Sequence, residues 1–214
     1  MSKFYLFLSI VFLYVLIFWL NKTFILPESK LIELLSKNYS NELINGYLDY
    51  QRKWKWLNYV MIPIVYIVKI FLVAFCLNFI KLFFLPGLEK IQFSDLVFIV
   101  MIAEFVFIIA GFFKFINFYW IDTGYSLEEV QTYYPISLVN MRDYISTEKW
   151  LNYPLQLVNI FEFFYWGVLG WGIWELSDKK ISFLKAFGLV AVTYGVALLF
   201  WVGIVSFLIL NSQY

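Results

Sequence analysis

Five polar residues lie within otherwise apolar segments of this chain, and their side chains are the best candidates for chemistry: Lys69, Glu104, Gln156, Asn159 and Glu162. A charge near the centre of a bilayer costs about 2.5–3.5 kcal/mol on insertion scales, so such residues face protein or water. In one hypothesis Lys69 pairs with one glutamate, while the other shuttles a proton or binds a cation beside the two amides. In a second, the three charges neutralise one another and fix how the helices pack. In a third, a glutamate faces a charge on another protein's helix.

The residue composition excludes several kinds of catalytic and metal-binding site. The chain has no histidine, and its single cysteine, Cys76, lies in an apolar segment. This excludes the usual zinc sites, histidine-ligated haem, Ser/His and Cys/His catalytic pairs and internal disulfides. The triplet Asp122-Thr-Gly124 has the form found in aspartic proteases, but no second triplet accompanies it. We therefore predict a non-enzymatic protein with no catalytic residue, no metal and no cofactor.

The overall composition indicates an integral membrane protein. Of the 214 residues, 63% are hydrophobic and 14% charged, and the mean hydropathy is +0.77. A soluble domain has about 45–50% apolar and about 25% charged residues. The balance of 16 basic against 15 acidic residues leaves no positive excess to neutralise phosphates, which excludes nucleic acid as a partner. The lipid bilayer is the expected partner, together with other membrane proteins or a second copy.

We predict an all-α fold with five transmembrane helices in a single membrane domain, residues 1–214. The predicted spans are approximately 4–26, 57–80, 94–120, 153–174 and 181–210. In the fourth span one face, about 120° wide, collects the polar and small residues Gln156, Asn159, Glu162, Trp166 and Gly170. That face must contact protein or water.

An amphipathic segment, 28–56, follows the first span, and it is predicted to lie on the membrane surface as a helix. It ends in a run of basic and aromatic residues typical of an interfacial anchor, Arg52, Lys53, Trp54, Lys55 and Trp56. Docking of a partner protein is the alternative role for this segment.

The last span carries a loose stripe of small residues, Gly188, Ala191, Gly195, Gly203 and Ser206. Such stripes allow two helix backbones to approach closely in lipid. The expected neighbour is the polar face of the fourth span or another subunit.

Five spans place the two termini on opposite sides of the membrane. The loops 21–56 and 121–150 carry about eight lysines and arginines, against about six on the other side. This difference favours a cytoplasmic C-terminus in a bacterial inner membrane.

The C-terminal half resembles the short prokaryotic members of the Yip family. The residues that carry the resemblance are YYPISLVNM (133–141), YPLQLVNIFEFFYWGVLGWGIW (153–174) and TYGVALLFWVGIVSF (193–207). The resemblance extends over about residues 57–210 and rests on the number of spans, their spacing and a proline-containing loop before the fourth span. It implies a five-pass helical membrane protein, and eukaryotic relatives interact with Rab GTPases and trafficking machinery. This chain differs from them by lacking a long soluble N-terminal region and by beginning with a hydrophobic helix.

From these features we expect an accessory or assembly subunit of an envelope transport or export complex. It would bind its partners through segment 28–56 and the small residues of the last span. The alternative is a small autonomous transporter or channel that uses the five buried polar residues as its coupling site.

Overall fold

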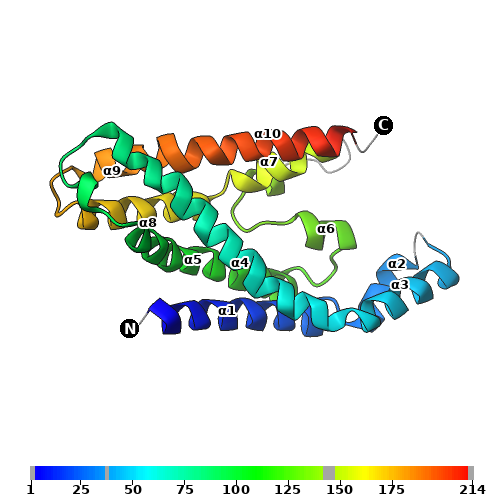
Figure 1. Ribbon diagram of the computed structural model, residues 1–214. Helices are drawn as coiled ribbons and strands as arrows, with labels where there is room; N and C mark the ends of the chain where they lie inside the picture. The colour runs from blue at the N-terminus through cyan, green and yellow to red at the C-terminus, as the bar shows by residue number, and fades with distance from the viewer. Residues whose placement is uncertain (1–2, 37–38, 142–147, 212–214) are drawn as a thin grey trace.

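The computed structural model describes residues 3–36, 39–141 and 148–211 (Figure 1). This part of the chain is helical apart from turns and loops, and its only β-type pairing is one antiparallel bridge between Ser137 and Asn159. The predicted all-α class is therefore confirmed. Four helices are long and apolar enough to cross a bilayer, which is compatible with an integral membrane protein: Lys3–Ile25, Lys55–Phe83, Phe93–Ile121 and Phe183–Asn211.

Each of these four long helices contains a short stretch of different helical geometry. The first is α1 (Lys3–Leu20) with a π-helical end, Asn21–Ile25, and the second is α4 (Lys55–Asn78) with a 3₁₀ end, Phe79–Phe83. The third is α5 (Phe93–Ile116) with a π-helical end, Asn117–Ile121. The last consists of α9 (Phe183–Val190), a π-helical segment (Ala191–Gly195) and α10 (Val196–Asn211).

Helix α5 lies at the centre of the bundle. It packs against α1, α4 and α8 (Ile160–Leu176), and α8 packs in turn against α9. In Figure 1 helices α1, α5, α8 and α10 run roughly along one direction, while α4 crosses them obliquely. Because α5 has neighbours on several sides, it is more buried than the other three long helices. Glu104, near the middle of α5, is therefore enclosed by protein.

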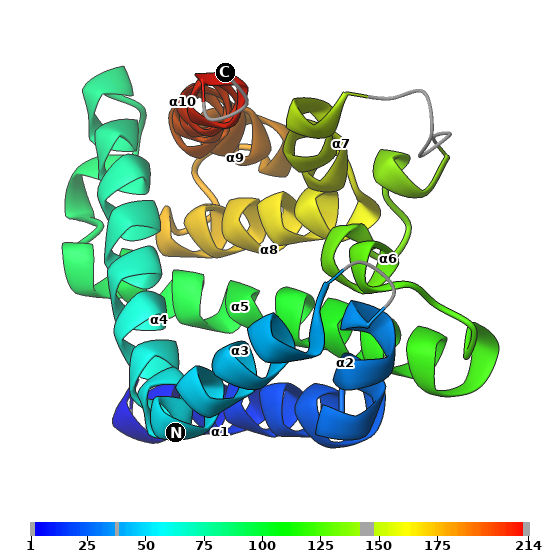
Figure 2. The ribbon, with the colours of Figure 1, turned by 90° about the vertical axis from the view of Figure 1, so that its right-hand side faces the viewer.

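The short helices gather at one end of the bundle, the end that α10 reaches (Figure 1). Here α2 (Glu28–Leu35) and α3 (Asn41–Lys53) extend beyond α1 and α4, and α6 (Leu127–Thr132) and α7 (Asn152–Leu157) lie at the same end. The view in Figure 2 looks onto this end, with α3 crossing in front of the bundle. The N-terminus, the 3₁₀ turn Leu88–Lys90 and the connection between α8 and α9 lie at the opposite end.

The predicted single helix over 153–174 is divided in the structure. Between α7 and α8, Asn159 has extended backbone angles, and its side-chain oxygen accepts a hydrogen bond of 2.8 Å from the Glu162 N–H. Asparagine is favoured at this N-cap position because its side chain competes with the helix for backbone groups. The prediction of one continuous polar face is therefore wrong, since it assumed an unbroken helical period across this residue.

The loop before α7 satisfies the backbone groups that this break exposes. The Leu138 N–H donates to the Val158 carbonyl at 3.0 Å, and the Ile160 N–H donates to the Ile136 carbonyl at 3.2 Å. Helix α7 is also tied to α10, because the Trp201 indole donates to the Tyr153 hydroxyl at 2.9 Å. The irregular backbone between α7 and α8 is thus paired with other groups of the protein.

Candidate functional site

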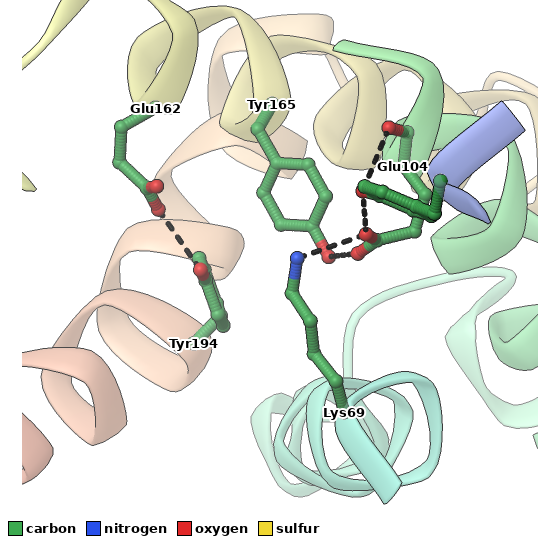
Figure 3. A network of polar contacts seen from close by, with 6 residues as sticks. Lys69, Glu104, Glu162, Tyr165 and Tyr194 are labelled. Carbon is green, nitrogen blue, oxygen red and sulfur yellow. Dashed lines mark hydrogen bonds and ion pairs between the residues drawn. The ribbon is translucent and has the colours of Figure 1, made fainter. Parts of the chain in front are cut away.

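The buried carboxylate of Glu104, on α5, is the centre of the polar network (Figure 3). Its Oε2 atom accepts hydrogen bonds of 2.8 Å from the Lys69 amine on α4 and 2.8 Å from the Tyr14 hydroxyl on α1. Its Oε1 atom accepts a third, of 3.2 Å, from the Tyr165 hydroxyl on α8. One side chain thus joins α5 to three other helices. Two of the three predicted mid-membrane charges, Lys69 and Glu104, do meet.

The amine of Lys69 also lies over aromatic rings. It is 4.1 Å from the ring centre of Phe107, 5.6 Å from that of Tyr165 and 5.9 Å from that of Tyr66. Such contacts stabilise a desolvated cation by about 0.5–2 kcal/mol. The side chain keeps 33% of its surface exposed, whereas Glu104 has none. The glutamate of the ion pair is therefore fully buried, whereas part of the lysine side chain is exposed.

The third predicted charge, Glu162, belongs to a neighbouring network. Its Oε1 atom accepts hydrogen bonds of 2.9 Å from the Trp166 indole and 2.9 Å from the Tyr194 hydroxyl. Tyr165 lies between Glu162 and Glu104 in Figure 3, and its ring centre is 5.5 Å from that of Tyr194. The carboxylates thus share one tyrosine-rich interior, but each has its own hydrogen-bond donors.

Gln156 and Asn159 have other partners than the predicted cluster. The Gln156 amide donates to the Thr132 carbonyl at 2.5 Å, and the Asn159 amide donates to the Gln156 carbonyl at 2.8 Å. Their bonds therefore hold the break between α7 and α8 and its neighbour α6. Within the described residues, no group of three or more Cys, Asp or Glu side chains is placed to hold a metal ion.

The small residues of the last span do not share one packing environment. A Cβ added at Gly195 would lie 2.6 Å from Cη2 of Trp166, so this glycine permits close contact with α8. Added at Gly188 or Gly203, it would meet no atom within 4 Å. Ala191 lies in the π-helical segment, and the Oγ atom of Ser206 is buried with no hydrogen-bond partner in the described chain. A still closer contact between helices involves Gly172 on α8, which was not predicted: an added Cβ would lie 2.5 Å from Cγ2 of Ile99.

The predicted interfacial anchor spans the junction of α3 and α4. Trp54 is the single residue between α3 and α4, and its ring centre is 6.2 Å from that of the exposed Trp56. Lys53 and Lys55 flank it and are exposed.

Arg52, the remaining anchor residue, joins the start of α2 to the end of α3. Its guanidinium pairs with the carboxylate of Glu28, and with that of Asp49 at 3.3 Å. The hydrogen bond from Arg52 lowers the pKa of Glu28.

The sequence did not identify the tyrosines of the centre. Tyr14, Tyr165 and Tyr194 donate to the two carboxylates, and Tyr14 stacks on Tyr66 with ring centres 3.6 Å apart. In the loop after α6, burial raises the pKa of Tyr134 above its usual value, and the nearby Glu162 charge adds to this shift. Tyrosine is common throughout this aromatic-rich chain, so nothing in its local pattern marks these positions.

The fold and this centre define a class: an all-helical protein with four helices able to cross a bilayer and a buried Lys–Glu pair among them. No family model, curated protein or solved structure matches the chain.

Proposed function

We propose that this protein is a non-enzymatic accessory or assembly subunit of an envelope transport or export complex. The observation that supports this most is the engagement of Glu104 by three donors from three helices. A carboxylate held in this way fixes how helices pack, and its bonds would have to break before it could bind a transported ion. The mid-membrane charges are thus best explained as structural connections.

Our proposal includes five membrane crossings, with α8 as the fifth. Its 17 residues have a length of about 26 Å, near the ~30 Å of a hydrocarbon core. Helix α7 precedes it at the end where α2 and α3 lie (Figure 1). Five passes are also what the resemblance to the short prokaryotic Yip proteins implies. In this arrangement α2, α3 and the C-terminus are on the cytoplasmic side of a bacterial inner membrane.

The helical pair α2–α3 is the proposed partner-binding element, with the residues from Arg52 to Trp56 at the lipid headgroups. One face of the pair is packed internally, through Leu31, Ile44 and Leu48. Leu43 and Tyr50 on α3 are each 64% exposed. These exposed side chains lie beyond the end of the bundle, where a partner can reach them.

Purification from native membranes in mild detergent, with mass spectrometry of whatever accompanies the chain, tests the proposal. We expect other membrane proteins in fixed ratio. The variant Glu162→Gln should lower the abundance or the co-purification of the complex, because it weakens the bonds from Trp166 and Tyr194. Glu89→Gln, in an exposed turn, is the matched control and should leave both unchanged. A chain that purifies alone would contradict the subunit role.

An autonomous transporter is the second candidate, favoured by the partly exposed side chain of Lys69, which pairs with the buried carboxylate of Glu104. Here Glu162→Gln would abolish transport while leaving folding and abundance intact. The same variant thus separates the two candidates.

A further inference from the structure

Two lysines without an acidic partner lie at the end of the bundle from which α2 and α3 extend (Figure 1). Lys22 belongs to the π-helical end of α1, and Lys55 is the first residue of α4. Within the described part of the chain, neither amine makes an ion pair or a hydrogen bond. Nearby Arg52, by contrast, pairs with Glu28 and Asp49. The charges of the two lysines therefore have no counter-ion among the described residues.

A contact between α1 and α4 places the two lysines close to each other. The rings of Phe18 and Tyr59 meet edge to face, with their centres 5.5 Å apart. The Lys22 amine lies 6.0 Å from the ring centre of Phe18. Lys55 precedes Tyr59 by four residues, and residues four apart lie on the same face of a helix. Both lysines thus extend from the Phe18–Tyr59 contact toward the same end of the bundle.

This pair of lysines has the chemistry of an anion site. Lys55 is exposed and Lys22 is half-buried, so a ligand can reach both side chains. Lysine carries its charge on a flexible four-carbon stem, and each ammonium group has three N–H donors. Two neighbouring ammonium groups repel each other, and one anion between them removes that repulsion. A phosphate group, with its several acceptor oxygens, fits both amines.

The surface beside the two lysines is that of a lipid-facing helix. Trp56 follows Lys55 and is 56% exposed. Val60, Ile64 and Ile67 continue the same face of α4 at helical spacing, and they are 45%, 46% and 42% exposed. Tryptophan and lysine are typical of the headgroup level, and an apolar stripe beneath them suits acyl chains. A phosphate that also carries acyl chains complements both parts of this surface.

We infer that Lys22 and Lys55 bind the headgroup phosphate of an anionic phospholipid, whose acyl chains lie along the exposed apolar face of α4. Basic pockets between helices at the cytoplasmic boundary of a membrane bind anionic headgroups in this way. The inference rests on the proposed placement of this end of the bundle at the cytoplasmic headgroups. It deepens that proposal by adding a specific lipid ligand and by giving Lys22 a role.

Native mass spectrometry of the full chain in detergent, titrated with phosphatidylglycerol and phosphatidylcholine, tests the inference. We expect one phosphatidylglycerol molecule to be retained in preference to phosphatidylcholine, because only the former carries a net negative charge. The double variant Lys22→Gln/Lys55→Gln should weaken this binding about thirtyfold, the effect expected of removing two lysines beside an anionic headgroup. Equal retention of the two lipids by the wild type would overturn the inference.

Two matched double variants show whether position and charge both matter. Lys90→Gln/Lys185→Gln removes two exposed lysines at the opposite end and should leave the affinity for phosphatidylglycerol unchanged. Lys22→Arg/Lys55→Arg keeps both charges and should retain most of the affinity. An equal loss in the Lys90/Lys185 variant, or a complete loss in the arginine variant, would reject the site.

Inorganic phosphate distinguishes a lipid site from a site for a free anion. Added at the concentration of the lipid, it should not displace phosphatidylglycerol, because it lacks the acyl chains that contact α4. Displacement at that concentration would overturn the assignment to a lipid.

The lipid site and the subunit role can fail separately. Partners that co-purify in fixed ratio, together with equal retention of the two lipids, would preserve the subunit role and reject the lipid site. A chain that purifies alone but selects phosphatidylglycerol through Lys22 and Lys55 would preserve the lipid site and reject the subunit role.

Discussion

Glu104 shows how a buried acid can be accommodated in an apolar interior. It has no exposed surface, and three donors surround its two oxygens. Burying a charge is costly unless it is paired and hydrogen-bonded, and losing one partner costs more than the pair contributes. Lys69, the ionic partner of Glu104, is therefore the residue whose loss should destabilise this centre most.

We expect Lys69→Met to lower the free energy of unfolding by about 3–5 kcal/mol, the usual effect of leaving a buried charge without its ionic partner. Thermal unfolding in detergent would measure the change. Adding Glu104→Leu to Lys69→Met should recover part of the loss, because the unpaired charge is then gone. Lys90→Met, at an exposed position, is the control. Equal stability of Lys69→Met and the wild type would show that the ion pair has no structural role.

At the scale of elements, α2 and α3 form a small unit of their own beyond the bundle (Figure 1). Leu31, Ile44 and Leu48 bury its inner face. The exposed Arg52–Glu28 ion pair links the beginning of α2 to the end of α3. Because the pKa of Glu28 is lowered by this hydrogen bond, the stability of the unit must depend on pH.

Because the pKa of Glu28 is lowered in the folded state, acid should destabilise the α2–α3 unit. The contribution of the ion pair is present above the ordinary glutamate value of 4.5 and is lost as the pH falls through the lower, folded-state value. Hydrogen-exchange protection factors of α2 and α3, corrected for the intrinsic pH dependence, should therefore fall in that acidic range. Glu28→Gln should remove the decrease in protection that depends on the Arg52–Glu28 ion pair. Glu42→Gln, at another position on α3, should retain this decrease. Identical curves for the wild type and Glu28→Gln would contradict the assignment.

At the scale of the whole molecule, the two termini lie at opposite ends of the bundle, and α8 connects one end to the other (Figure 1). The turn Leu88–Lys90 and the α8–α9 connection share one end, while α6 lies at the other. The membrane topology thus depends on whether α8 crosses the bilayer.

Single-cysteine labelling in a Cys76→Ser background tests this topology. With five crossings and a cytoplasmic C-terminus, Lys90→Cys and Lys180→Cys should react with a membrane-impermeant maleimide in intact cells. Glu128→Cys, on α6, should react only after lysis. If Lys180→Cys and Glu128→Cys showed the same pattern of labelling before and after lysis, α8 would not cross the bilayer. Reversal of all three patterns would keep the five crossings and invert the orientation.

The sequence by itself determined the environment of this protein and its helical class. Long apolar runs can satisfy their backbone groups in lipid only as helices, and charges inside such runs must be paired, so Lys69 and Glu104 were identifiable from composition and position alone. Tertiary structure decided which groups meet. Periodicity assigns a face to each helix separately, so it could not reveal that Glu104 takes Tyr14 and Tyr165 as donors while Glu162 takes Tyr194. Nor could it locate the break at Asn159, where a cap and a distant loop replace the helical hydrogen bonds.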